Sequence, residues 1–498
     1  MTLEFLQAKN GEKTFCINKV FFHSSYAPSK EAERFIQSQD FPYTPEIIFL
    51  IEPGYPYLYK LLKEKYQNAK IVCIRLIKEF EESSEWDFTL QYTSQNDFEQ
   101  IICNNFDESK LLKSIMFTWT PAATVFKKEN TEIWAIYKKC LDRAKTMLVT
   151  RQYFEKKWLY NSCRFFSFLQ NPCTLKTKTN FPVVITASGP SLKSSLEVLK
   201  KNKDKIFIIS ASSSLSVLIA NKIIPDIVIT TDGGFWAAEH LKLLVKKYNQ
   251  IPIAVTSEAF VQTQILLKNP VIPLRYKDGI SDSFFELCNI PYMTAQRNGT
   301  VSGTALNFAE EITNNEIYFC GLDLSIAEGF QHTQPNEIEL NNCLKDYRIN
   351  NIYTRTTKSE FPVQKNTESS SLAIYLNWFC NYNFKNKTYR VINNSKNKIN
   401  GLTDISADEF ETLLKDKKII NKTEIIQKKD ENSEILINKN KKKILDFINK
   451  NCDSKEWKEQ LFPIDYVSLS HAENIDIRNK LEEKNNKLVE KLRNLLNE

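Results

Sequence analysis

The sequence predicts an α/β protein whose central part is a doubly wound, mostly parallel sheet. Short apolar stretches of strand length alternate with segments whose apolar residues recur at three- and four-residue spacing, which is the pattern of consecutive βαβ units. Small and polar residues follow several of the apolar stretches, where the strands of an open sheet would end. We therefore expect a Rossmann-like central domain, a smaller N-terminal α/β domain and a helical C-terminal region.

The N-terminal α/β domain is expected over residues 1–125. From Glu46 to Leu76 the sequence reads as strand, turn, helix and strand, in the segments EIIFLIE, PGYP, YLYKLLKEKY and AKIVCIRL. The two strands should be parallel, because a parallel pair is joined by a crossover connection of this kind. Residues 126–178 then carry apolar residues at helical spacing and predict a helical linker.

The central domain is expected over residues 179–408. It begins with FPVVITASGPSLKSSLEVLKK, which reads as an apolar strand, a turn of small residues and a helix. Further strands are expected at Ile206–Ser210, Ile227–Thr231, Ile253–Thr256 and Glu316–Cys320. Residues 409–498 are rich in Lys, Asn and Glu and predict the helical C-terminal region. Four leucines form a helical stripe there that we expect to pack within the protein: Leu481, Leu488, Leu492 and Leu495.

Composition and charge argue against several classes of protein. The 498 residues hold 67 Lys and Arg against 60 Asp and Glu, and this surplus is spread along the chain, so no nucleic-acid partner is expected. Eleven cysteines without a CxxC pair predict reduced thiols rather than disulfides or a zinc site. The N-terminus lacks a secretory signal, and the most apolar stretch is shorter than the ~20 residues that span a bilayer. We expect a cytoplasmic protein without membrane insertion.

The turn from Ala187 to Leu192 is the first candidate for ligand binding. It lies between a strand and a helix, where backbone N–H groups at the helix N-terminus can receive a phosphate. Gly189 would allow a ligand to approach closely, Pro190 suits the first turn because it needs no N–H donor there, and Ser191 could cap the helix or touch the ligand. The alternative is a turn that only reverses the chain, and spacing alone leaves both open.

Polar residues also follow the neighbouring strands. They are Ser210 to Ser214, Thr231 to Gly234, Ser257 with Glu258, and Gly321 to Asp323. Open α/β sheets bind ligands at this edge, so we expect these residues to share one crevice. Asp232, beside two glycines, could accept hydrogen bonds from a ribose or hold a cation, and its alternative role is an Asx turn.

A second helix start, rich in hydroxyl groups, is expected between Arg297 and Thr304. Arg297 supplies a cation that would suit the phosphate of a nucleotide or the carboxylate of an acidic sugar. Thr300 or Ser302 could equally be no more than an N-cap.

These segments, taken in order, resemble a known family. The succession ASGPSL, IPDIVITTDGG, NGTVSGTALNFA, IYFCGLDLSIAEGFQHTQP and VINNSKNKINGL resembles the central domain of the motility-associated factors, and covers Phe181 to Leu402. Upstream, GYPYLYKLL, MFTWTPAATVF and TRQYFEKKWLYNS are similar to that family's N-terminal domain and linker. The central domain is similar in turn to the CMP-sialic-acid-dependent sialyltransferases and to an archaeal-type pterin pyrophosphokinase.

The resemblance implies a binding site for a CMP-activated sugar. It places the CMP phosphate and ribose near Ser188, Gly189, Pro190 and Ser191. It places the base or ribose near Ser212 and Asp232, and the donor phosphate near Ser302 and Gly303. One departure is Ala187, which stands where the family's G-x-G-P-S turn has its first glycine and leaves less room for a ligand.

His332 is the best candidate for proton transfer, because it ends the GLDL-like segment. The ordinary histidine pKa of about 6.5 suits a general base acting on a serine or threonine hydroxyl. Its rival roles are a donor to the departing phosphate and a histidine of a surface loop. Asp323 could orient His332, coordinate a cation or cap its own loop. His23 and His240 lie away from these motifs in the sequence and are treated as structural.

The resemblance therefore implies transfer of a nonulosonic sugar, such as pseudaminic acid, from a CMP donor to serine or threonine of flagellin. No cofactor is required for this reaction, although a divalent cation such as Mg²⁺ could assist. The first alternative is a pyrophosphokinase, which would need Mg²⁺ and converging carboxylates, and the sequence has no GxxxxGK[ST] loop. The second is a protein that binds flagellin or a nucleotide without catalysis.

Overall fold

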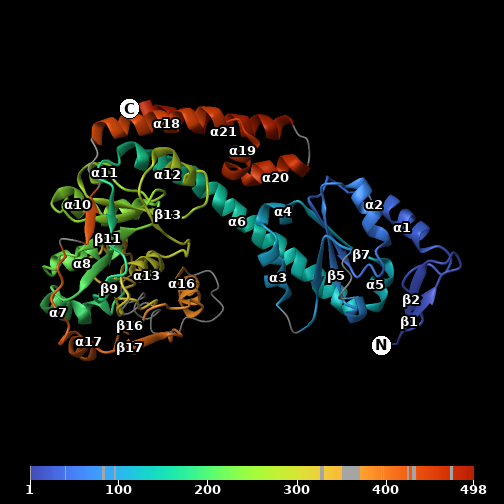
Figure 1. Ribbon diagram of the computed structural model, residues 1–498, viewed down its shortest axis with the longest axis horizontal. Helices are drawn as coiled ribbons and strands as arrows, with labels where there is room; N and C mark the ends of the chain where they lie inside the picture. Colours follow the sequence, from blue (N-terminus) through green and yellow to red (C-terminus); the bar gives the residue numbers. More distant parts are fainter. Residues whose placement is uncertain are drawn as a thin grey trace. The chain divides into compact units, whose positions relative to one another are not determined.

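The computed structural model describes the chain apart from residues 1, 40, 81–84, 95–96, 326–329, 350, 352–370, 394, 396, 423–424, 429–432, 472–474 and 498 (Figure 1). The described residues form two compact units. The first unit is Met1–Glu155 with Cys452–Leu488, and the second is Lys156–Asn451 with Val489–Glu498. The C-terminal helices are thus shared between the two units. The finer division into four segments that we expected from the sequence stays a prediction.

The first unit contains a parallel sheet of four strands in the order β6-β5-β4-β7. The strands are β4 (Ile47–Ile51), β5 (Lys70–Arg75), β6 (Phe88–Gln91) and β7 (Ser114–Thr118). Helix α2 (Tyr57–Lys65) joins β4 to β5, which confirms the βαβ unit predicted from Glu46 to Leu76. Alternate residues of β4 enter two hydrophobic clusters, one on each face of the sheet.

The other elements of the first unit surround this sheet or continue from it. A small antiparallel sheet consists of β1 (Leu3–Gln7), β2 (Lys13–Ile17) and β3 (Val20–Phe21). The helices are α1 (Pro28–Gln37), η1 (Lys78–Phe80), α3 (Phe98–Asn105), α4 (Glu108–Leu112), α5 (Thr120–Val125), α19 (Lys455–Leu461) and α20 (Pro463–His471). Two long helices belong to both units, α6 (Lys127–Phe168) and α21 (Ile475–Asn497). The predicted leucine stripe lies on α21, and its four leucines are buried.

The second unit is built on a parallel sheet of nine strands in the order β14-β13-β12-β11-β10-β9-β15-β16-β17. The strands are β9 (Val183–Thr186), β10 (Phe207–Ala211), β11 (Ile227–Thr230), β12 (Ile253–Thr256), β13 (Val271–Arg275), β14 (Met293–Thr294), β15 (Ile317–Cys320), β16 (Thr388–Val391) and β17 (Leu402–Ile405). The chain runs outward from β9 to β14, returns to pair β15 with the free edge of β9, and ends at β17. The direction of winding therefore reverses between β9 and β15, and this is the switch point where such sheets bind ligands.

Helices cover both faces of this sheet, which confirms the doubly wound fold (Figure 1). Val183 and Ile185 of β9 belong to a cluster with α13 (Val301–Ile312) and α16 (Ser371–Cys380), whereas Val184 belongs to one with α7 (Leu192–Asn202) and α8 (Leu215–Ala220). The remaining elements are β8 (Cys173–Leu175), η2 (Ser212–Ser214), α9 (Phe235–His240), α10 (Lys242–Lys246), α11 (Thr263–Lys268), α12 (Asp282–Cys288), α14 (Glu337–Leu344), α17 (Ala407–Leu414), β18 (Ile426–Lys428) and α18 (Ser433–Asn451). Within the described ranges, no helix has the length and apolar character needed to cross a bilayer.

Candidate functional site

The turn between β9 and α7 lies against the loop that follows β15, at the switch point of the sheet. The backbone N–H of Ala187 donates a hydrogen bond to the carbonyl oxygen of Cys320 (2.9 Å), and that of Gly189 donates to Gly321 (2.8 Å). A Cβ atom on Gly189 would lie 2.5 Å from the Gly321 carbonyl oxygen and 2.2 Å from Oδ2 of Asp323. The close packing of the two loops therefore requires a glycine at position 189, where from the sequence we expected an opening for a ligand.

Asp323 binds the start of α7 from across the switch point. Its two carboxylate oxygens accept hydrogen bonds from the backbone N–H of Ser191 (3.0 and 3.1 Å), and Oδ2 also accepts from Oγ of Ser191 (2.7 Å). Burial raises the pKa of Asp323, although the hydrogen bonds from Ser191 oppose this shift. A carboxylate thus occupies the helix start where the CMP phosphate and ribose were expected, and a phosphate at Ser191 would have to displace it.

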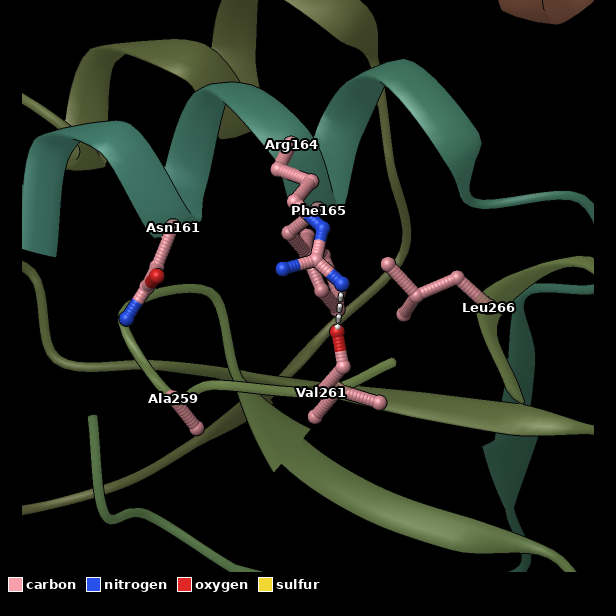
Figure 2. Close-up of a pocket in the computed structure, with 6 residues that line it drawn as sticks. All are labelled: Asn161, Arg164, Phe165, Ala259, Val261 and Leu266. Carbon is pink, nitrogen blue, oxygen red and sulfur yellow. Dashed lines mark hydrogen bonds between the residues drawn. The ribbon is translucent and has the colours of Figure 1, made fainter. Parts of the chain in front are cut away.

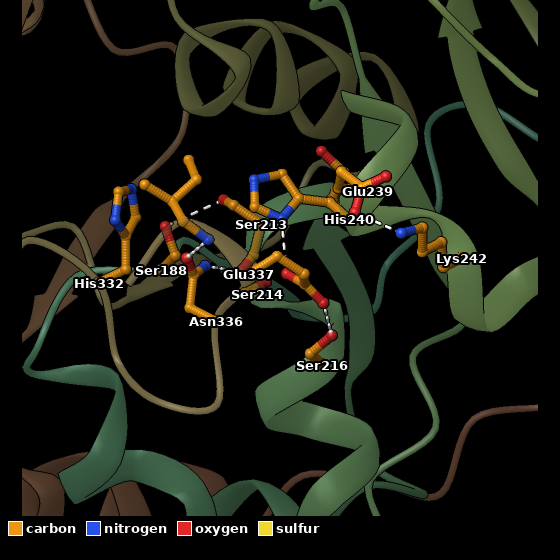
Figure 3. Close-up of polar contacts among 12 residues, drawn as sticks. Ser188, Ser213, Ser214, Ser216, Glu239, His240, Lys242, His332, Asn336 and Glu337 are labelled. Atoms are coloured by element: carbon orange, nitrogen blue, oxygen red, sulfur yellow. Dashed lines mark hydrogen bonds and ion pairs between the residues drawn. The ribbon is translucent and has the colours of Figure 1, made fainter. Parts of the chain in front are cut away.

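The segment with His332, the predicted base, is hydrogen-bonded to the turn between β9 and α7 (Figure 3). The backbone N–H of Thr333 donates to the carbonyl oxygen of Ser188 (2.7 Å). Nδ2 of Asn336 donates to the carbonyl oxygen of Ser213 (3.0 Å), and Oγ of Ser213 donates to Oγ of Ser188 (2.9 Å). Two neighbouring loops at the carboxyl edge of the sheet therefore hold this segment, and His332 precedes Thr333 directly.

His332 is paired with Glu339 of α14 and not with Asp323. Nδ1 of His332 lies 3.0 Å from Oε1 of Glu339, which also accepts hydrogen bonds from the backbone N–H groups of Gln331 and His332, both at 3.0 Å. The side chain of Glu339 is 3% exposed and that of His332 15% exposed, so the carboxylate is buried and the ring is partly accessible to solvent. From the sequence we expected Asp323 as the possible partner; the hydrogen bonds to its carboxylate come from Ser191 instead.

His240 lies in the same region, although its sequence position suggested that it was remote. Nδ1 of His240 lies 2.7 Å from Oε2 of Glu337, and Oγ of Ser216 donates to the other oxygen of that carboxylate (Figure 3). His240 is buried on α9, and Glu337 opens α14. A structural role for His240 fits these contacts, because the pair of His240 and Glu337 joins α9 to α14, the helix that also carries Glu339.

Ser212 and Asp232 end the next two strands of the sheet. Ser212 is buried, and its Oγ lies 3.4 Å from Oγ1 of Thr230. Asp232 is exposed, and its Oδ1 accepts a hydrogen bond from the backbone N–H of Gly234 (2.8 Å), which is the Asx turn named as its alternative role. Burial raises the pKa of Tyr375 on α16, and the nearby charge of Asp232 raises it further. Tyr375 therefore borders this part of the edge, and nothing in the sequence had pointed to it.

Arg297 is engaged by two carboxylates of the protein. Its guanidinium donates to Oε1 of Glu258 (2.6 Å) and to both oxygens of Asp278 (2.7 and 3.0 Å). It also lies over the rings of Trp158 and Tyr276, 5.0 and 4.4 Å from their centroids. A phosphate or sugar carboxylate at Arg297 would therefore compete with Glu258 and Asp278, whereas from the sequence we expected an available cation.

Ser302 and Gly303 lie in the first turn of α13, as predicted. A Cβ atom on Gly303 would lie 2.9 Å from side-chain atoms of both Asn298 and Trp378, so this glycine admits close packing of the helix. Thr300 is the N-cap by position, yet its side chain makes no capping bond, and Oδ1 of Asn298 accepts from its backbone N–H (3.1 Å). Ser302 is partly buried and does not serve as the cap.

The structure thus brings only part of the predicted set to the switch point. The residues that lie there are Ser188, Gly189, Pro190, Ser191, Asp323 and His332. Ser212 and Asp232 follow β10 and β11, Arg297 is paired with residues that follow β12 and β13, and Ser302 and Gly303 lie at the start of α13.

We did not predict Glu339 from the sequence, although the residues before it mark the start of a helix. Asn336 is the N-cap of α14 and accepts from the backbone N–H of Glu339 (3.4 Å), so the N-x-x-E spacing marks a helix start. In a capping box the glutamate would reach back to the N-cap backbone, whereas here it binds His332.

A small hollow lies under the last turns of α6 (Figure 2). It is lined by Asn161, Arg164, Phe165, Ala259, Val261 and Leu266. The guanidinium of Arg164 donates to the carbonyl oxygen of Val261 (2.6 Å) and lies 4.7 Å from the ring centroid of Phe260. None of the predicted site residues lines this hollow. The hydrogen bond from Arg164 joins α6 to the loop after β12.

Comparison with known proteins agrees with this architecture. Residues 156–329 match the family model described as 6-hydroxymethylpterin diphosphokinase MptE-like. An uncharacterized protein of Treponema pallidum (strain Nichols) is 29% identical over 278 residues, which is 56% of this chain and 59% of that protein. The chain therefore matches less than two thirds of that relative's length.

Among solved structures, the Maf glycosyltransferase from Magnetospirillum magneticum AMB-1 aligns with 100% of this chain and 90% of its own, with a TM-score of 0.51 and 11% sequence identity. At this identity the likeness is one of fold. The resemblance seen in the sequence is confirmed to that extent: the chain shares the fold of the Maf glycosyltransferase, and residues 156–329 match the MptE-like family model.

Proposed function

We propose that the chain is a glycosyltransferase of the motility-associated-factor type, which transfers a nonulosonic sugar from a CMP-activated donor to serine or threonine hydroxyls of flagellin. The premise is the fold that it shares with the Maf glycosyltransferase. The observation that carries the proposal is the position of His332, whose segment is hydrogen-bonded to Ser188 at the switch point. Ligands of open α/β sheets bind at this place, so a base there faces the bound donor.

In the proposed reaction, His332 takes the proton of the acceptor hydroxyl while the hydroxyl oxygen bonds to the anomeric carbon of the sugar. The bond from that carbon to the donor phosphate breaks, and CMP leaves with the bonding electrons. In this proposal the leaving phosphate displaces Asp323 from the start of α7, where the backbone N–H and the hydroxyl of Ser191 then stabilise its negative charge. This scheme requires no divalent cation, and we expect transfer to continue in excess EDTA.

The decisive experiment is mass measurement of intact flagellin from a strain that lacks this gene. We expect the loss of a repeated mass increment of the size of one nonulosonic sugar, and its return when the gene is restored. The matched control is restoration with the His332→Ala variant, which should leave flagellin unmodified. Flagellin of unchanged mass in the deletion strain would refute the proposed acceptor.

A pyrophosphokinase activity is the second candidate, because the matching family model is named for a diphosphokinase. Among the residues that the structure describes, no group of three or more His, Cys, Asp or Glu side chains is placed to hold a metal ion. Ligand-dependent stability separates the two activities. We expect CMP at a hundred times its dissociation constant to stabilise the protein by ~2.7 kcal/mol. Stabilisation by ATP with Mg²⁺ but not by CMP would favour the pyrophosphokinase.

A further inference from the structure

We propose that Glu339 is a positioning residue that holds His332 in the tautomer whose Nε2 is free to accept a proton. The inference rests on the proposed function, in which that nitrogen deprotonates the acceptor hydroxyl. It assigns a task to a buried carboxylate that the proposed reaction does not otherwise use.

The hydrogen bonds around Glu339 determine which ring nitrogen carries the proton. Burial alone would raise the pKa of Glu339, but its bonds with His332 outweigh that effect and lower it. The carboxylate is therefore ionised at neutral pH and can only accept hydrogen bonds. Nδ1 of a neutral His332, 3.0 Å from Oε1, must then be the donor. The lone pair of the neutral ring is left on Nε2, as a general base requires.

The carboxylate itself is held in a fixed position. Oε1 accepts from the backbone N–H groups of Gln331 and His332 as well as from the ring, so three donors converge on one oxygen. Asn336 caps the helix that carries Glu339 and is itself bound to Ser213 at the carboxyl edge. The orientation of the ring is thereby tied to the backbone of the switch point, with little freedom to turn.

The other acidic groups nearby have partners of their own. Glu337, on the same helix, binds His240 and Ser216. Asp323, on the loop after β15, binds Ser191. The charged side chain hydrogen-bonded to the His332 ring in the described part of the chain is Glu339, which makes it the residue to test.

The first test is the tautomer itself, measured without any sugar donor. The full chain labelled with [¹⁵N]histidine contains four histidines, and the His332→Gln variant identifies the signals of His332. We expect ¹⁵N spectra above the titration range to show a protonated Nδ1 and an unprotonated Nε2. A protonated Nε2, or equal amounts of the two tautomers, would overturn the proposal.

The second test separates positioning from binding. Removal of a partner that orients a metal-bound histidine typically costs about 10- to 100-fold in metal affinity or activity, and we expect a similar factor for His332. We therefore expect Glu339→Ala to lower kcat by that factor, to mix the tautomers and to leave the Kd for CMP unchanged. Glu339→Gln keeps an oxygen acceptor, so it should keep the tautomer and recover most of the lost rate. An unchanged kcat in Glu339→Ala would refute the role, as would a Glu339→Gln variant that keeps the tautomer yet is equally slow.

The matched control is Glu337→Ala, which removes the other histidine partner of the same helix. It should shift the signals of His240 and leave the tautomer of His332 as in the unmodified chain. If Glu339→Ala does not fold, the spectrum of the unmodified chain and the Glu339→Gln variant still decide the question. The expected tautomer together with no transfer from any CMP-activated sugar would refute the proposed function while leaving the positioning of His332 intact.

Discussion

Replacing Arg297 by methionine tests whether this arginine serves the fold or the donor. Methionine keeps an unbranched apolar stem between Trp158 and Tyr276 but removes the charge. Glu258, which is 6% exposed, then loses the guanidinium that lies 2.6 Å from its Oε1 and keeps the hydroxyl of Ser281 at 3.0 Å. The variant therefore leaves a buried carboxylate with one neutral donor on that oxygen.

The expected loss of stability is larger than for an ordinary surface charge. Each of the two ring contacts contributes about 0.5–1 kcal/mol. Leaving a buried acceptor short of its partner adds about 1–3 kcal/mol. Arg297 is itself 35% exposed, so water can reach part of the site and the lower half of this range applies. The contributions sum to about 2–5 kcal/mol, so in the lower half of that sum we expect unfolding in urea to require about 2–3.5 kcal/mol less free energy than in the unmodified chain.

A second substitution shows which part of the loss comes from Glu258. Adding Glu258→Gln to Arg297→Met removes the unpaired charge, so the double variant should recover about 1–2 kcal/mol of the loss. The assay is urea unfolding of both variants, together with CMP binding under native conditions. Unchanged stability combined with weakened CMP binding would refute this reasoning and return Arg297 to the donor site, as the sequence alone had suggested.

Three further predictions concern single positions. Gly189→Ala should cost about 1–3 kcal/mol of unfolding free energy, because its Cβ would meet the Gly321 carbonyl oxygen at 2.5 Å. A cost no larger than that of Ser194→Ala, at an exposed position of α7, would contradict this. Burial lowers the pKa of His23 to about 3, against about 6.5 when unfolded, so the unfolded chain binds the proton first and stability falls from about pH 6.5 to about pH 3. His23→Gln should reduce the pH dependence of the urea midpoint over that window, and an identical slope would show that another group is responsible. His332→Ala should keep the fold and CMP binding and lose about 10²–10⁴-fold in transfer rate, whereas weakened donor binding would indicate a phosphate ligand and full activity would remove it as the base.

Local patterns in the sequence were sufficient to predict the central elements of the fold. The βαβ unit from Glu46 to Leu76 and the strand, turn and helix beginning at Phe181 were predicted because their apolar residues have the right period. Strands β13, β14, β16 and β17 were not predicted; in β16 (TYRV) and β17 (LTDI) a charged residue interrupts an already short apolar run. Arg390 of β16 is buried and pairs with Asp404 of β17 at 2.7 Å, so each charge neutralises the other across the sheet. A search for apolar runs does not recognise such a pair.

The site was less predictable, because its contacts join segments far apart in the chain. Residue type and sequence context pointed to His332 and Ser191, and the structure has both residues at the carboxyl edge. Neither residue type nor sequence position determines which partner a side chain will bind. Asp323 accepts hydrogen bonds from Ser191, and Arg297 donates to two carboxylates. In both cases the partner lies on another loop. Such choices depend on the distances between loops, which no single segment contains.

The order of the strands also has a consequence for how the protein is made. β9 occupies the middle of its sheet, but the strand that completes it, β15, is synthesised much later: Ser191 and Asp323 are 132 residues apart. At about 5–20 residues per second, the ribosome needs roughly 7–26 s to deliver the second partner. During that interval the apolar strand VVIT can present an unpaired edge, onto which another nascent chain could pair. Until β15 has been made, the growing polypeptide is thus open to misassembly at the β9 edge of its sheet.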